Sequence, residues 1–388
     1  YRSTQPHIQL EQQFPDDFSV TFEMNPNWLD LEFFKKYQII HIHKGIFKDM
    51  DAFHKAMIFF KENNIVTILD IDDHWKTDHR HPQHMIHKIH KRDEEIKNNL
   101  KIFDYVTTTT EFFKKEILPF NKNVFIFPNA INPEDPRFQI KKNDSKRLRI
   151  GLVMGSTHEY DLALIGKITE LLSKEELEQV QFVLCGYDLR GTMREINKQT
   201  GQIKERPIKP EESVWYRYEK MLTCDYKIVS QEHKDFLLKF MQYTDYYNSE
   251  NESYRRCWTK PIDSYYQHYA NIDVLLAPLD ISEFNKVKSP LQVAECVFSK
   301  TAIIASDYGP YTLDLRNAFQ RGGEIDDTAN ALLVHPTKNN KHWLRFIKIL
   351  IKNRDLVKKL QDNLYEDLHE KYDLRNVTKD RAEFYKKI

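Results

Sequence analysis

The chain has 388 residues, more than one hydrophobic core usually organises, so its length predicts two α/β domains. Its 58 basic and 58 acidic side chains cancel, which argues against non-specific nucleic-acid binding as the main role. No run approaches the roughly 18 apolar residues of a membrane span, and the first residues lack a signal-peptide pattern.

Cysteine usage indicates the compartment. The cysteines lie far apart without a C-x-x-C pair, so the sequence predicts neither a zinc ribbon nor a disulfide framework; they are Cys185, Cys224, Cys257 and Cys296. We therefore expect a cytoplasmic protein, with peripheral contact at the inner face of a membrane left open. Because the chain starts at Tyr1 rather than at a methionine, we also expect residues upstream of it in the native protein.

The first clear pattern is a β-α-β unit. Residues 39–43 and 65–69 predict strands, and residues 51–61 predict an amphipathic helix between them. The carboxyl ends of parallel strands face the ligand crevice, so the polar residues that follow these strands are candidates for function: His43, Lys44, Gly45, Asp70, Asp72 and Asp73. The alternative is that Asp72 and Asp73 only cap a loop or a helix start.

Histidines follow at spacings of three, at His81, His84, His87 and His90. This spacing places imidazoles on one helical stripe, as a metal site would need. Because no carboxylate or cysteine recurs at ligand spacing with them, we predict a polar helix that is solvated or faces a bound ligand, and no metal.

The chain then repeats strands and helices. Residues 101–118 and 124–132 predict two strands, the first of which runs into a helix, and the polar, proline-containing residues 132–147 predict an interdomain linker. After it comes a strand with a Gly155-Ser156-Thr157 turn before a helix. Small residues there would let a phosphate approach the backbone, although a lone glycine is more often only a turn requirement.

Residues 189–254 break this rhythm and predict a helical insertion. Its Trp215, Tyr216 and Tyr218 could stack on a ring of a bound ligand, but packing on their own domain is the commoner role of such aromatics.

The stretch from Asp280 to Tyr311 carries the strongest site pattern. Ser289 and Pro290 predict a helix start with Gln292 in a capping box, and the helix should bury Leu291, Ala294 and Phe298 before a strand at residues 301–305. Lys286 and Lys288 beside the positive end of a helix suit a diphosphate, and Glu295 could accept hydrogen bonds from a ribose diol. The alternative is a capped surface helix with solvated lysines.

The segments FNKVKSPLQVAE and TAIIASDYGPY resemble the donor site of GT-B-fold glycosyltransferases, particularly group-1-like enzymes of bacterial surface polysaccharide assembly. HIHKG, LDIDDHW, DYVTTTTE and PNAI resemble other segments of that family, and in its G-S-x-x-H-x-x-D-L pattern His158 and Asp161 match. Of the two glutamates that flank the donor segment in many relatives, Glu295 matches the second, whereas Val287 occupies the first position.

The resemblance implies two facing Rossmann-like domains. We expect an acceptor-side domain at 1–131, a linker at 132–147, a donor domain at 148–374 that contains the insertion, and a helix at 375–388 that returns to the first domain. It also implies that Asn129 lies at the edge of the interdomain cleft.

The resulting hypothesis is a glycosyltransferase that moves a sugar from a UDP- or GDP-linked donor to a glycan or lipid-linked acceptor, with retention and without a metal or other cofactor. The residues with expected catalytic roles are His43, Asp72 and Asp73. Those expected to bind the donor are Gly155, Ser156, His158, Lys286, Lys288, Ser289 and Glu295, and those expected at the acceptor or cleft are Lys44, Asn129 and Tyr311. Two alternatives stay open: a phosphohydrolase that uses the D-x-D-D run at residues 70–73, and a catalytically degenerate partner subunit, suggested by Val287.

Overall fold

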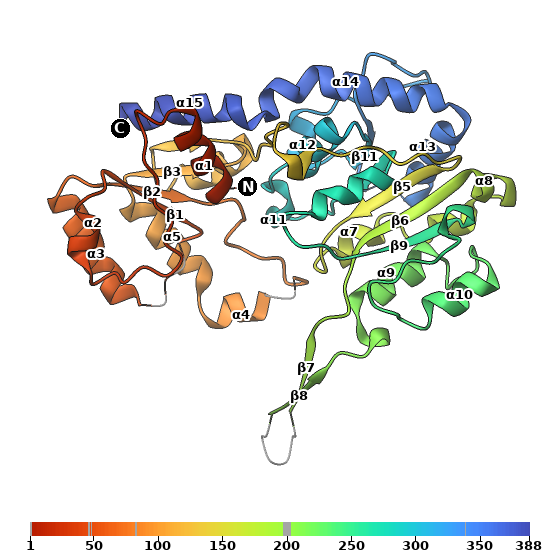
Figure 1. Ribbon diagram of the computed structural model, residues 1–388, viewed down its shortest axis with the longest axis horizontal. Coiled ribbons are helices and arrows are strands. Elements are labelled where there is room, and N and C mark those ends of the chain that lie inside the picture. Colours follow the sequence, from red (N-terminus) through yellow and green to blue (C-terminus); the bar gives the residue numbers. More distant parts are fainter. Residues whose placement is uncertain (1, 46, 48, 82–83, 197–202, 338) are drawn as a thin grey trace.

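The computed structural model describes residues 2–45, 47, 49–81, 84–196, 203–337 and 339–388. Two α/β domains lie side by side, and the last two helices of the chain lie one over the second domain and one over the first (Figure 1). In the part of the chain so described, no helix combines the length and the apolar character needed to cross a membrane.

The first domain is built on a parallel sheet of four strands in the order β1-β2-β3-β4. The strands are β1 (Ile39–His43), β2 (Val66–Asp70), β3 (Tyr105–Thr108) and β4 (Val124–Ile126). The helices of this domain are α1 (Thr4–Gln13), α2 (Leu31–Phe34), α3 (Met50–Glu62), α4 (His84–Ile89), α5 (Arg92–Ile102) and α6 (Glu111–Ile117). In β1 and β2, His43 pairs with Asp70, so the polar residues that follow both strands emerge at one edge of the sheet.

The second domain contains a parallel sheet of six strands in the order β12-β11-β10-β5-β6-β9. The strands are β5 (Leu148–Val153), β6 (Val180–Tyr187), β9 (Tyr254–Trp258), β10 (Val274–Ala277), β11 (Ala302–Ser306) and β12 (Leu332–Val334). β10 and β11 are buried along their whole length, as expected for parallel strands with both faces covered.

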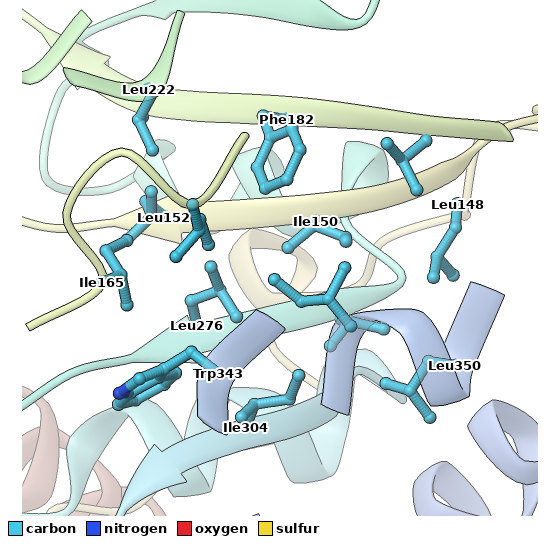
Figure 2. Packing of buried hydrophobic residues seen from close by; sticks show 14 of the residues in the cluster. Leu148, Ile150, Leu152, Ile165, Phe182, Leu222, Leu276, Ile304, Trp343 and Leu350 are labelled. Carbon is cyan, nitrogen blue, oxygen red and sulfur yellow. The ribbon is translucent and has the colours of Figure 1, made fainter. Parts of the chain in front are cut away.

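Helices cover both faces of this sheet. They are α7 (Glu159–Ala163), α8 (Lys174–Gln179), α9 (Val214–Leu222), α10 (Gln231–Leu237), α11 (Glu283–Lys286), α12 (Leu291–Ser299), α13 (Asn340–Lys352) and α14 (Arg354–Tyr372). Figure 2 shows the core on one face, where Ile150, Phe182 and Leu276 from the strands pack near Trp343 and Leu350 of α13.

The buried face of α12 differs from the predicted one. Leu291 and Phe298 are only partly buried, whereas Val293, Ala294 and Val297 are enclosed. The helix lies between the sheet and α14, so its buried surface is set by two neighbours rather than by one apolar stripe.

The insertion between β6 and β9 is only partly helical, which corrects the prediction. It begins with an antiparallel hairpin, β7 (Thr192–Ile196) and β8 (Ile203–Pro207), that projects from the body of the protein (Figure 1). Residues 197–202 lie outside the described residues. α9 and α10 then pack on the domain, where buried Glu219 of α9 accepts hydrogen bonds from Arg256 of β9 at 2.6 and 2.9 Å.

Two crossings join the domains, and they lie against each other. Residues 132–147 lead from β4 toward β5, and the chain crosses back between α14 and α15 (Leu374–Lys387). The backbone N–H of Ile131 donates to Tyr372, and that of Leu374 donates to Ile131, each at 2.9 Å. α15 then packs on α1 of the first domain, so the C-terminal helix is part of that domain's core.

Candidate active site

A cavity of about 640 Å³ lies where the carboxyl ends of the two sheets face each other. In open α/β sheets, this edge is where ligands bind. Ten of the residues predicted for the site line it, from both domains: Asp72, Asp73, Asn129, Gly155, Ser156, His158, Lys288, Ser289, Glu295 and Tyr311.

The wall of this cavity contains a cation, Lys288. In the described part of the chain no carboxylate forms an ion pair with it, although Asp161 and Asp73 lie close enough to act on its pKa. Burial lowers the pKa of Lys288, and these two carboxylates oppose that shift. Lys286, by contrast, is exposed and is not among the described residues of the wall. The structure therefore separates two lysines that the sequence analysis grouped together.

The turn after β5 is open toward the cavity. A Cβ atom at Gly155 would meet only His158 Cδ2 at 3.9 Å, an ordinary contact, so packing does not demand a glycine there. His158 Nδ1 lies 2.6 Å from Asp161 Oδ2, and Asp161 Oδ1 accepts from the backbone N–H of Asp280 at 2.7 Å. Burial alone would raise the pKa of Asp161, but the hydrogen bond with His158 and the charge of Lys288 lower it. The turn is thus fixed to the segment that carries Lys288.

The start of α12 is not capped as predicted. Pro290 is the residue before the helix, and no side chain caps it. Ser289 Oγ instead accepts a hydrogen bond from Asn129 Nδ2 at 2.7 Å, and Gln292 Nε2 donates to the carbonyl of Val153 at 2.7 Å. The capping-box prediction is wrong because both side chains make tertiary contacts. Ser289 joins the domains at the cavity, beside a helix start whose first N–H groups have no intrahelical acceptor.

Glu295 lies on α12 at the cavity wall, but it is only 2% exposed. One carboxylate oxygen accepts from Tyr269 at 2.7 Å, and the other accepts from the hydroxyl of Tyr265. Because each carboxylate oxygen has two lone pairs, a further donor such as a ribose hydroxyl can be accepted only at the remaining positions. Tyr311 is likewise engaged, since its hydroxyl donates to Gln292 Oε1 at 2.8 Å.

Solved structures share this arrangement over most of the chain. Sucrose-phosphate synthase from Thermosynechococcus elongatus matches with a TM-score of 0.57 at 10% identity, covering 95% of this chain and 80% of its own. Anabaena HepE in complex with UDP and glucose matches with a TM-score of 0.55 at 10% identity, covering 92% and 80%. A glycosyltransferase from Rickettsia africae matches with a TM-score of 0.57 at 14% identity, covering 99% and 94%. The chain has the GT-B fold.

Sequence comparison adds no closer relationship. No family model matches the chain, and no curated protein is similar to it in sequence. The GT-B fold therefore rests on the three-dimensional arrangement, and the roles of individual residues must be argued from their contacts.

In the first domain, four of the predicted site residues form two hydrogen-bonded pairs beside the cavity. His43 Nε2 lies 3.2 Å from Asp72 Oδ1, and Lys44 Nζ donates to Asp73 Oδ2 at 3.1 Å. Burial lowers the pKa of His43, whereas burial and the charge of Asp73 raise the pKa of Asp72. The two aspartates line the cavity, but His43 and Lys44 are not among its described lining residues. His43 borders a separate groove of the first domain instead.

Asp70 is not available for chemistry. It is fully buried, and it accepts hydrogen bonds from Arg2 Nε at 3.0 Å and from Thr107 Oγ1 at 2.6 Å. Burial would raise its pKa, but the Arg2 guanidinium holds that pKa well below the ordinary value. A phosphohydrolase of the alternative type needs an exposed nucleophile at the start of its D-x-D-D run, so the geometry of Asp70 argues against it.

Val287 occupies the first-glutamate position of the segment that resembles the family, and it packs against the first domain. It is 1% exposed and packs in the core of the first domain, where Thr110 Oγ1 donates to its carbonyl at 3.5 Å. A carboxylate at this position would be buried among apolar side chains without a partner. In this chain the position serves contact between the domains.

The three aromatics of the insertion have different roles. Trp215 contributes to the cavity wall beside Gly186, while Tyr218 is fully buried and its hydroxyl donates to the carbonyl of Ser156 at 3.2 Å. Tyr216 packs against the domain core. Tyr216 and Tyr218 therefore pack on their own domain, as the predicted alternative states. Trp215 packs there too, but it also lines the cavity.

Sequence reasoning missed the part of the wall at the carboxyl ends of β6 and β9. These residues are Gly186 near the end of β6, Asp188 directly after it, and Thr259 and Lys260 directly after β9. Their position at the ends of parallel strands was a usable signal, but β9 follows the irregular insertion and was not recognised as a strand of this sheet. The histidine run forms no ligand cluster within the described chain, and α4 buries none of its residues. His81, which precedes α4, packs against Phe284 of α11 with ring centroids 5.3 Å apart.

Proposed function

We propose that this protein is a glycosyltransferase that uses a UDP- or GDP-linked sugar and transfers it to a glycan or lipid-linked acceptor. The observation that carries the proposal is the ammonium group of Lys288, which lies in the interdomain cavity without a carboxylate partner among the described residues. A half-buried cation beside a helix start is suited to a diphosphate, which needs positive charge and free N–H groups.

In this proposal the donor lies against the second domain. Its diphosphate would contact Lys288, the first N–H groups of α12 and the open turn at Gly155, and its ribose would face Glu295. When the bond from the anomeric carbon to the diphosphate breaks, negative charge grows on the leaving phosphate. Groups that are already fixed in place stabilise that charge without reorganising, so they act mainly on the transition state.

The acceptor would enter from the first domain. Asp72 and Asp73 line the cavity opposite the donor side, and His43 and Lys44 hold them by hydrogen bonds. We assign His43 and Lys44 a positioning role, because each reaches the cavity only through its aspartate. The raised pKa of Asp72 suits a group that receives the hydroxyl proton of the acceptor as the new glycosidic bond forms. Retention of configuration and independence from a metal are part of the proposal and follow from the family resemblance.

The first experiment is a thermal-shift screen of nucleoside diphosphates and nucleotide sugars, because a ligand that binds the native state raises its melting temperature. UDP is the first candidate, since HepE is solved with UDP and glucose. Ligands that raise the melting temperature are then tested for release of the nucleoside diphosphate with an acceptor mixture. If calorimetry detects no nucleotide binding at all, the protein is a degenerate partner subunit and the proposal is refuted.

A further inference from the structure

Two cysteines that are 72 positions apart in the sequence become neighbours in the second sheet. Cys185 on β6 and Cys257 on β9 are register partners, so their side chains lie on the same face of the sheet. Both are buried, and His268 from the 3-10 helix Tyr265–Asn271 completes the group. The ligand atoms of the three side chains all lie within 4.8 Å of one another.

The chemistry of this group favours a thiophilic cation. Zn²⁺ takes cysteine sulfur and histidine nitrogen in a tetrahedral shell, whereas Mg²⁺ and Ca²⁺ prefer oxygen. His268 is only 3% exposed, and its Nε2 atom is buried without a hydrogen-bond partner. An imidazole nitrogen left unpaired in the interior is costly, and a metal ion would satisfy it.

The group borders the interdomain cavity, because Cys185 and His268 are among the residues that line it. We propose that Cys185, Cys257 and His268 bind a single thiophilic divalent cation of the Zn²⁺ class, with its fourth coordination position facing the cavity. Closed structural zinc sites have four protein ligands, whereas three protein ligands leave the fourth position to water or another small ligand. This site does not depend on the proposed transfer reaction, which uses other residues.

The test uses the full chain after removal of metal by chelation and dialysis. Titration with Co²⁺ should produce, at equimolar saturation, the visible bands of a tetrahedral ion and a thiolate-to-cobalt charge-transfer band, and Zn²⁺ should displace them. Mg²⁺ should produce no displacement. Cys257→Ser should remove part of the charge-transfer intensity, and His268→Gln should weaken Co²⁺ binding by more than the roughly 10–100-fold that loss of an outer-shell partner costs.

The matched control is Cys224→Ser, which changes a buried cysteine outside the group. It should bind Co²⁺ as the wild type does. Because a buried substitution can prevent folding, a second measurement uses the wild type alone: Zn²⁺ should raise its melting temperature, and Mg²⁺ should not. The inference is overturned if Co²⁺ gives no charge-transfer band, if Cys224→Ser abolishes the band, or if oxidation joins Cys185 to Cys257 in a disulfide while the reduced protein takes up no metal.

Discussion

Replacing Lys288 by alanine should remove most activity without unfolding the protein. The ammonium group lines the cavity and forms no ion pair in the described structure, so its loss leaves no buried carboxylate unpaired. A cation about 4 Å from one unit of developing charge, at an effective dielectric constant of about 20, contributes about 4 kcal/mol. Removing a single fixed donor from such a site typically costs about 3 kcal/mol. We therefore expect kcat to fall about 100-fold or more.

The assay is release of the nucleoside diphosphate from the donor identified by thermal shift, with the melting temperature recorded for each variant. Lys286→Ala is the matched control, because Lys286 is two residues away but exposed outside the cavity wall. The control should keep wild-type turnover. Equal turnover in Lys288→Ala and the wild type, or equal losses in both variants, would refute the assignment of the diphosphate to this wall.

Three further outcomes are expected. Glu295→Gln should reduce the affinity for nucleoside diphosphate by roughly one to two orders of magnitude in calorimetry, because charge-assisted hydrogen bonds to the ribose are lost. Unchanged affinity with a lowered melting temperature would mean that this carboxylate only binds the hydroxyls of Tyr265 and Tyr269. Glu219→Gln should lower the free energy of unfolding, measured in urea, by about 3–5 kcal/mol, because it leaves Arg256 as a buried charge without its ionic partner. The control is Glu159→Gln in the exposed pair with Arg217, which should lower it by at most about 1 kcal/mol. Burial, with the charge of Arg381, lowers the pKa of His7 from 6.5 to about 4. The unfolded chain therefore takes up this proton first, and the free energy of unfolding should fall by up to roughly 3 kcal/mol as the pH drops from about 6.5 to about 4. A His7→Gln variant whose stability depends on pH as that of the wild type does would contradict this.

The sequence by itself determined the repeat of buried strands and helices. A parallel strand that is covered on both faces appears in the sequence as a short apolar run. The run at residues 301–305 corresponds to β11 within one residue. Polar or small residues directly after a strand can likewise be recognised from a few neighbouring positions. This is why the sequence predicted Asp72 and Gly155 for the cavity. These features depend on neighbours within a few positions along the chain.

Only the tertiary structure decided which of several similar residues reach the cavity. Asp70 and Asp72 look alike in the sequence, but Arg2, 68 positions away, encloses Asp70 in a buried ion pair. Ser289 was predicted as a helix cap, yet it binds Asn129 of the other domain, because a tertiary donor competes with the local N–H groups. Cys185 and Cys257 have no spacing pattern, and they meet because β6 and β9 pair in register. Hydrogen-bond partners and the burial of charges depend on which distant segments the fold brings together. The periodicity of apolar residues along the chain does not indicate which segments those are.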